Sequence, residues 1–167
     1  YWLDEMRLHK MTTYLDCNPD CSMCFNKLYV YNVASKRYRF LKRQAGLPEK
    51  LDGWDILNAP FNNPIVNLTA CVYRISAIKH IPQCIYSGIV SELSVALSML
   101  RSGKVAFWNE PISVYRQHEK GVYSGLDKRK NIEYRIKSRQ TMHDVAEDCY
   151  KPLLLETIEK LKKQLEG

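Results

Sequence analysis

Glu92 and His118 are the residues whose types and positions first suggest a reactive site. Glu92 follows Ser91 at the expected start of a helix, where the serine can cap the helix and a carboxylate suits the helix dipole. His118 follows Tyr115 and Arg116 after a strand-like alternation. A carboxylate can act as a general base, and a histidine can bind a metal ion. The pattern is compatible with a site at a sheet edge, and equally with a helix cap and a surface histidine.

A second group of reactive side chains is formed by Cys17, Cys21 and Cys24. Their spacing is the one with which radical-SAM enzymes bind three irons of a four-iron cluster. Pro19 lies inside this spacing and Met23 stands where an aromatic residue is usual, so an iron-sulfur protein is only a remote alternative. A zinc half-site at Cys21 and Cys24 would need a second Cys/His pair downstream, and none has ligand spacing. We therefore expect reduced thiols rather than a cluster or a disulfide framework.

Two elements would position Glu92 and His118. Apolar residues recur at helical spacing after Ser91, and Ser102 with Gly103 ends this helix. A strand is expected at 104–108, followed by a break at Asn-Glu-Pro and a short alternation that leads to His118.

Other periodic segments alternate between helical and strand-like patterns. Such alternation favours an α/β architecture, and we expect a mixed sheet of about three to five strands flanked by helices. The expected helices are 4–17, 54–58, 76–81, 131–150 and 152–165, and the expected strands are 22–33, 37–41 and 65–73.

Composition and charge narrow the class of protein. The chain has 167 residues, of which 46% are hydrophobic, so it can form a real core. No run of about 18 apolar residues occurs, so we expect no transmembrane helix and a cytoplasmic protein. The net charge of +7 permits an anionic partner such as a nucleoside diphosphate or an acidic membrane surface. Much of this charge lies in the last third, where it fits a solvated helix face better than a nucleic-acid site.

Several short motifs, taken in order, carry a resemblance to a known family. They are Tyr-Trp-Leu-Asp at 1–4, Asn-Pro-Asp at 18–20, Asn-Leu-Thr-Ala-Cys-Val-Tyr-Arg at 67–74, Gly-Lys-Val at 103–105, Asn-Glu-Pro at 109–111 and Tyr-Arg-Gln-His at 115–118. Together, from Tyr1 to about 125, they resemble the second half of a family 2 glycosyltransferase. The resemblance implies an incomplete GT-A-like, Rossmann-related domain at 1–125, followed by a basic helical tail at 126–167. It also makes the three cysteines ordinary helix-end and strand residues.

The resemblance implies specific roles for four residues. Glu92 occupies the position of the catalytic base, although it lacks the second acid and the aromatic residue that often accompany that base. Arg116 and His118 would lie near the diphosphate of the donor, with His118 as a metal ligand. Thr69 would line the sugar and acceptor cleft. Independently of the resemblance, the aromatic ring of Trp108 could stack on a sugar, although aromatic residues belong to the core by default.

The resemblance further implies an inverting enzyme that moves a sugar from a nucleotide-sugar donor to a hydroxyl of a glycan or lipid-linked acceptor, as in bacterial polysaccharide biosynthesis. In the full-length enzyme, Mg²⁺ or Mn²⁺ would be held by acidic residues expected just before Tyr1. We therefore expect this chain to be the acceptor-side half, inactive in isolation and without a tightly bound cofactor. We also expect peripheral membrane contact, and homodimers or strand-paired assemblies formed through exposed strand edges. The alternative is a non-catalytic module that binds a glycan or a protein partner.

Overall fold

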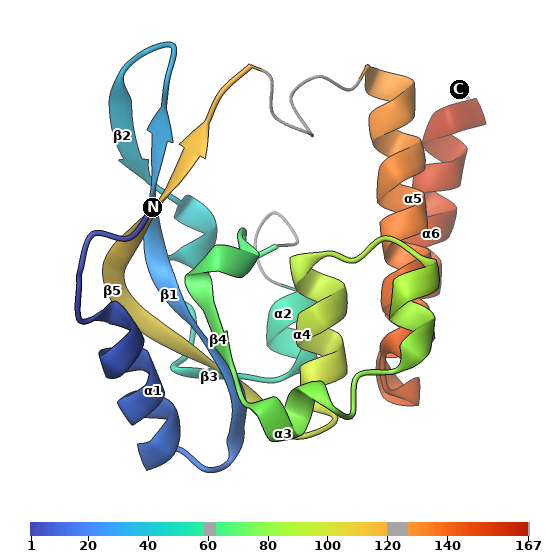
Figure 1. Ribbon diagram of the computed structural model, residues 1–167. Helices are drawn as coiled ribbons and strands as arrows, with labels where there is room; N and C mark the ends of the chain where they lie inside the picture. The colour runs from blue at the N-terminus through green and yellow to red at the C-terminus, as the bar shows by residue number, and fades with distance from the viewer. Residues whose placement is uncertain (59–62, 120–126, 167) are drawn as a thin grey trace.

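Two long parallel strands form the centre of the molecule. The computed structural model describes residues 1–58, 63–119 and 127–166 of the chain. β1 and β5 lie side by side in a five-stranded mixed sheet, with helices on both faces (Figure 1). The strand order is β2-β1-β5-β3, and β4 pairs with β1 beside β2. The α/β class and the expected number of strands are confirmed. The strands are β1 (Cys21–Asn32), β2 (Arg37–Phe40), β3 (Lys50–Leu51), β4 (Cys71–Tyr73) and β5 (Lys104–Gln117).

β1 pairs with three of the other four strands, whereas β3 pairs with β5. Its first six residues, Cys-Ser-Met-Cys-Phe-Asn, are all buried, as expected for a strand covered on both faces. β5 runs parallel to it along one edge, whereas β2 and β4 pair antiparallel to different parts of the other edge. The expected hairpin between β1 and β2 is confirmed, and its outer strand is exposed over all four residues.

β5 contains a bulge where the sequence predicted a break. Asn26 of β1 pairs with Trp108 of β5, but Leu28 already pairs with Ser113. Two steps along β1 therefore correspond to five steps along β5, and the strand continues through Asn-Glu-Pro instead of ending there. The side-chain amide of Asn26 donates to Ser113 Oγ at 2.7 Å, which joins the two strands at the bulge.

Helices cover the two faces of the sheet unequally. α1 lies on one face, and its buried residues Met11 and Leu15 pack against Cys24 and Ala106 of the sheet. The larger core lies on the other face, where Leu97 of α4 belongs to one cluster with sheet residues and with α5 and α6. The helices are α1 (Arg7–Cys17), α2 (Gly53–Asn58), α3 (Ile75–Ile78), α4 (Glu92–Leu100), α5 (Lys128–Val145) and α6 (Lys151–Glu166).

The long strand expected at 65–73 is wrong for most of its length. Only Cys71–Tyr73 forms a strand, and Leu68–Ala70 forms a 3₁₀ turn, η3. The side chain of Asn67 accepts hydrogen bonds from the backbone N–H and the hydroxyl of Thr69, each at 2.9 Å. A local turn stabilised in this way competes with strand pairing, and this explains the shorter strand.

The C-terminal helices pack side by side and continue the core of the sheet (Figure 1). Met142, Val145 and Leu154 belong to the same buried cluster as Phe25 of β1. The Tyr150 hydroxyl accepts a hydrogen bond from the Gly53 N–H at 3.3 Å. The predicted domain boundary between 125 and 126 lies outside the described residues.

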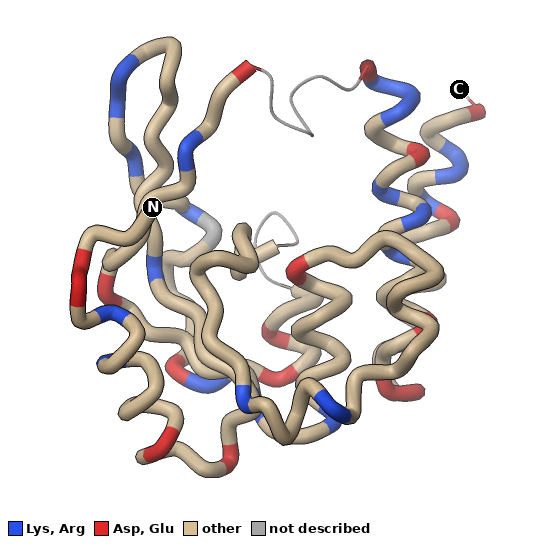
Figure 2. The backbone as a smooth tube through the Cα atoms, viewed as in Figure 1, with Lys and Arg blue, Asp and Glu red and all other residues tan. Residues whose placement is uncertain are grey.

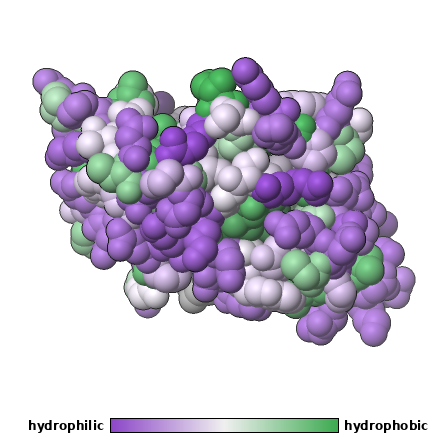
Figure 3. Space-filling model, turned by 90° about the horizontal axis from the view of Figure 1, so that it is seen from below, coloured by the Kyte–Doolittle hydropathy of each residue, from purple (hydrophilic) through white to green (hydrophobic). Residues whose placement is uncertain are grey.

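The surface is charged and mixed. Along α5 and α6, basic residues alternate with acidic ones (Figure 2), and pairs such as Arg129–Glu133 and Lys160–Glu156 neutralise part of the positive charge. From below, the surface is mainly hydrophilic and its hydrophobic residues form small patches (Figure 3). Among the described helices, none is both long and apolar enough to cross a membrane.

Candidate functional site

A pocket at the carboxyl end of β5 brings together three of the predicted site residues. Thr69, Arg116 and His118 line this pocket, which has a volume of about 350 Å³. Tyr1, Asn67, Val114 and Tyr115 complete the lining. Thr69 comes from η3, which lies 47 residues before Arg116 in the sequence, so the fold joins two motifs that were identified separately.

Two neighbouring residues of β5 that both line this pocket, Tyr115 and Arg116, point in opposite directions. Tyr115 packs against the cluster of Leu28 and Val30, so Arg116, the next residue in the strand, has the opposite orientation. At the N-terminus, Tyr1 closes the pocket through backbone hydrogen bonds with Val114. The guanidinium of Arg116 supplies positive charge for an anionic group.

Arg7 fixes the position of Thr69, and sequence reasoning missed it. Its side chain is 1% exposed, and it donates from Nε to Asn26 Oδ1 at 3.0 Å and from a terminal nitrogen to the Thr69 carbonyl at 3.1 Å. Trp2 stacks on the guanidinium at 4.6 Å. Burial lowers the pKa of Arg7. A signal existed: Arg7 lies four residues before Met11, on the buried face of α1.

Glu92 begins α4 as predicted. Ser91 caps the helix, and its side chain and that of Ser94 form a reciprocal capping box. The Glu92 side chain is partly buried, and this desolvation raises the pKa of its carboxyl, while a hydrogen bond with the Asn63 side chain lowers it. Sequence reasoning did not identify Asn63.

Glu92 is not in the lining of the pocket at the end of β5. It lies near Cys71 and Tyr73 of β4, whose pKa values are raised mainly by burial and further by the Glu92 charge. The pKa of Cys71 rises to about 12. In the described part of the chain, the buried Tyr73 hydroxyl has no hydrogen-bond partner of good geometry. Thr69 and Cys71 are two residues apart, so the η3–β4 segment connects the pocket to the surroundings of Glu92.

Trp108 lies in a different place from the other predicted substrate-binding residues. Its ring packs edge-to-face with Tyr14 of α1 at 5.1 Å, and its indole nitrogen donates to Glu110 at 3.0 Å. It lines a second pocket, at the start of the bulge in β5, and the structure does not place it with Thr69, Arg116 and His118.

The residues present do not by themselves form a site for Mg²⁺ or Mn²⁺. Among the described residues, the lining of the β5 pocket includes His118 but no carboxylate, whereas these ions prefer oxygen ligands. Over residues 1–58, 63–119 and 127–166, no group of three or more His, Cys, Asp or Glu side chains could hold a metal ion. Cys21 and Cys24 are buried, and burial raises the pKa of Cys24 to about 12, so these thiols behave as core residues.

Comparisons with family models, with curated proteins and with solved structures found no match to this chain.

Proposed function

We propose that this chain is the acceptor-side part of an inverting, GT-A-type glycosyltransferase of family 2. The enzyme would transfer a sugar from a nucleotide-sugar donor to a hydroxyl of a glycan or lipid-linked acceptor. It would work in the cytoplasm, at the inner face of the membrane when the acceptor is lipid-linked. Among the described residues, the lining of the pocket supplies no carboxylate for the divalent ion that such enzymes use, so no role proposed here depends on that ion.

The meeting of Thr69, Arg116 and His118 in one pocket is the observation that supports this proposal most. The resemblance implies that Arg116 and His118 lie near the donor diphosphate and that Thr69 lines the adjoining sugar and acceptor cleft. An arginine and a histidine side by side with a threonine form a suitable surface for a diphosphate and a neutral sugar. The parallel pairing of β1 with β5 brings the carboxyl ends of both strands to this edge of the sheet, where α/β proteins bind ligands.

Glu92 would take the proton from the acceptor hydroxyl as that oxygen attacks the anomeric carbon. The bond from the anomeric carbon to the diphosphate oxygen breaks in the same step, and the electron pair leaves with the nucleoside diphosphate. Partial burial raises the pKa of Glu92 and strengthens its carboxylate as a base. Arg116 would stabilise the negative charge that develops on the leaving diphosphate.

The test measures sugar transfer by the protein as its gene encodes it. Replacing Glu92 with Gln should lower the rate of sugar transfer by about 100-fold or more, because a positioned general base contributes at least that factor. Glu159→Gln is the matched control, since Glu159 lies on the exposed surface of α6, where it pairs with Lys162. Transfer by Glu92→Gln at the control rate would exclude Glu92 as the base.

A further inference from the structure

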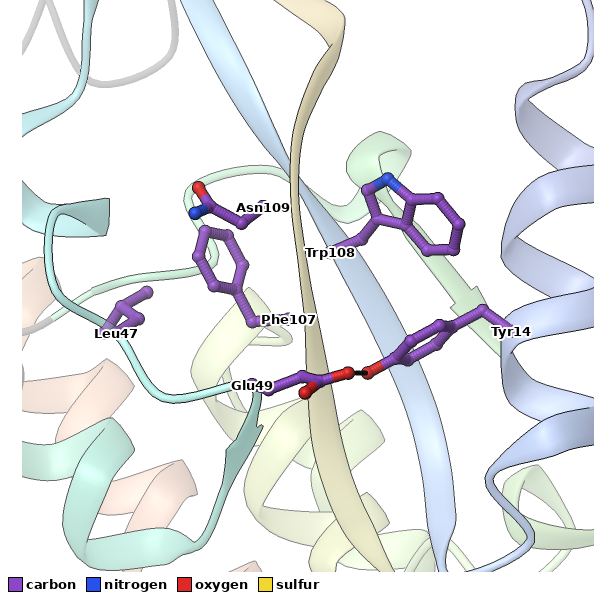
Figure 4. Close-up of a pocket in the computed structure, with 6 residues that line it drawn as sticks. All are labelled: Tyr14, Leu47, Glu49, Phe107, Trp108 and Asn109. Carbon is purple, nitrogen blue, oxygen red and sulfur yellow. Dashed lines mark hydrogen bonds between the residues drawn. The ribbon is translucent and has the colours of Figure 1, made fainter.

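A second pocket lies beside β5 at the start of the bulge, and of the residues with a predicted role only Trp108 lines it. Its volume is about 410 Å³, and its lining residues are Tyr14, Leu47, Glu49, Phe107, Trp108 and Asn109. Figure 4 shows Tyr14 and Trp108 on the α1 side of the strand and Leu47, Phe107 and Asn109 on the other side, while Glu49 reaches across to Tyr14.

The pocket lies where the outer edge of β5 has no paired strand in the described part of the chain. On one side, β3 and the segment before it pair with β5 up to Phe107, whose N–H donates to the Glu49 carbonyl at 2.7 Å. On the other side, pairing resumes where the Leu3 N–H donates to the Ile112 carbonyl at 2.9 Å. The bulge occupies the interval between them and leaves room for a ligand at the edge of the sheet.

Aromatic rings and two polar side chains meet in this interval. Tyr14 and Trp108 pack edge-to-face, so the wall that they form is rigid. The Tyr14 hydroxyl donates to Glu49 Oε1 at 2.5 Å, which holds the carboxylate across the pocket. Among the described residues, Glu49 Oε2 has no partner, and the Asn109 side chain bonds only through Oδ1, which accepts from Lys27 at 3.1 Å.

The pocket therefore offers an apolar ring surface beside a free carboxylate oxygen and a free amide N–H₂ group. Sugars have the complementary chemistry, with a C–H face that packs on aromatic rings and adjacent hydroxyls that can donate to a carboxylate and accept from an amide. The negative charge of Glu49 disfavours uronic acids and phosphorylated sugars, because like charges repel.

We propose that this second pocket binds one neutral sugar residue of a glycan. Because it is separate from the pocket of Thr69, Arg116 and His118, it would hold a part of the glycan that does not react. Its role as an acceptor subsite rests on the proposed transferase function, whereas sugar binding itself does not.

The experiment is a heteronuclear NMR titration of the chain with maltotriose, cellotriose and chitotriose as neutral probes. At least one of them should shift the amide signals of Tyr14, Glu49 and Asn109 and the indole signal of Trp108. Glu49→Gln should weaken this binding about tenfold, the loss expected for one hydrogen bond to a charged group. Glu159→Gln, which removes the same charge from α6, should bind as the unchanged chain does.

Four results would overturn the proposal: no shifts with any probe, shifts confined to other surfaces, unchanged affinity in Glu49→Gln, or tighter binding of a glucuronate-containing hyaluronan tetrasaccharide than of the neutral probes. These readouts are independent of catalysis. If the sugar binds but Glu92→Gln transfers normally, the proposed base fails and the subsite remains. If the Glu92 test succeeds without binding here, only the subsite fails.

Discussion

At the residue scale, Glu92 combines a good position for capping with an unfavourable environment. The start of α4 favours a carboxylate, but the partial burial of this one raises its pKa above the ordinary value of 4.5. The folded chain therefore binds a proton at Glu92 more tightly than the unfolded chain does. Ionisation of Glu92 costs stability, and this cost appears as the pH rises through the interval between the unfolded and folded pKa values.

We expect the substitution Glu92→Gln to increase stability at neutral pH, where it removes an ionised carboxylate. At about pH 4 the increase should be smaller, because Glu92 is then largely protonated and neutral, as glutamine is. The measurement is thermal unfolding by circular dichroism at the two pH values. Glu156→Gln should show the opposite and smaller trend, because an exposed hydrogen bond with Lys160 lowers the pKa of Glu156. A stability difference for Glu92→Gln that does not change with pH would contradict the prediction.

The site residues that the sequence could predict are those carried by local motifs. Thr69, Arg116 and His118 belong to such motifs, and the pocket contains all three. Arg7 could not be assigned, because its role depends on Asn26 and Thr69, which are distant in the sequence. For the same reason the second pocket was missed, since Tyr14 and Glu49 meet only after the sheet has formed.

At the scale of elements, the connection between α4 and β5 has little freedom. Gly103 has φ of +152°, and a Cβ atom there would lie 2.7 Å from the Asp20 carbonyl oxygen. The Gly103 carbonyl also accepts from the Ser22 hydroxyl at 3.1 Å. This close backbone approach aligns the beginnings of β1 and β5.

Gly103→Ala should therefore lower the free energy of unfolding by about 3 kcal/mol, from the strained φ and the clash together. Gly46→Ala is a matched control, because Gly46 has a positive φ of +74°, but a Cβ atom added there would meet no other atom within 4 Å. Its cost should be about 1 kcal/mol. Urea unfolding measures both values, and equal losses would show that the contact with Asp20 is unimportant.

Among the elements, α4 and the short β2 were predicted to within one residue, whereas α5 ends five residues before its expected end and β3 was not predicted. The helix that became α4 has both a cap and a regular apolar spacing, and its bounds agree with the expectation within one residue. β3 has only two residues and is defined by its pairing with Val105 and Ala106, which leaves no local pattern to detect. At Asn67 a turn formed in place of the expected strand, because the Asn67 side chain accepts a hydrogen bond from the backbone N–H of Thr69.

At the scale of the whole molecule, the C-terminal helices contribute directly to the core of the sheet. Leu154 of α6 is 1% exposed and belongs to the cluster that includes Phe25 and Phe107, whereas its neighbour Leu155 is 50% exposed. The α/β class could be predicted from the alternation of patterns. The packing of α5 against α4 and α6 could not, because it depends on which face of each helix meets the other elements.

Leu154→Ala should lower the free energy of unfolding by about 3 kcal/mol, as expected for a large buried side chain. Leu155→Ala should change it by less than about 0.5 kcal/mol. Urea unfolding should be followed by both tryptophan fluorescence and circular dichroism, because coincident curves would indicate one cooperative unit. A Leu154→Ala curve in which only the helical signal moves would show instead that α5 and α6 unfold separately. The expected homodimer stays a prediction, which sedimentation velocity can test.

The bulge in β5 also gives this protein a place where its length can change. Five steps along β5 match two steps along β1 there, so the alternation of side chains is already interrupted between Trp108 and Ser113. The orientations of Tyr115 and Arg116 depend on their pairing with Val30 and Tyr31 of β1, and not on the number of residues in the bulge. Evolutionary insertions and deletions in β5 should therefore collect between Trp108 and Ser113 and be rare in its regularly paired parts.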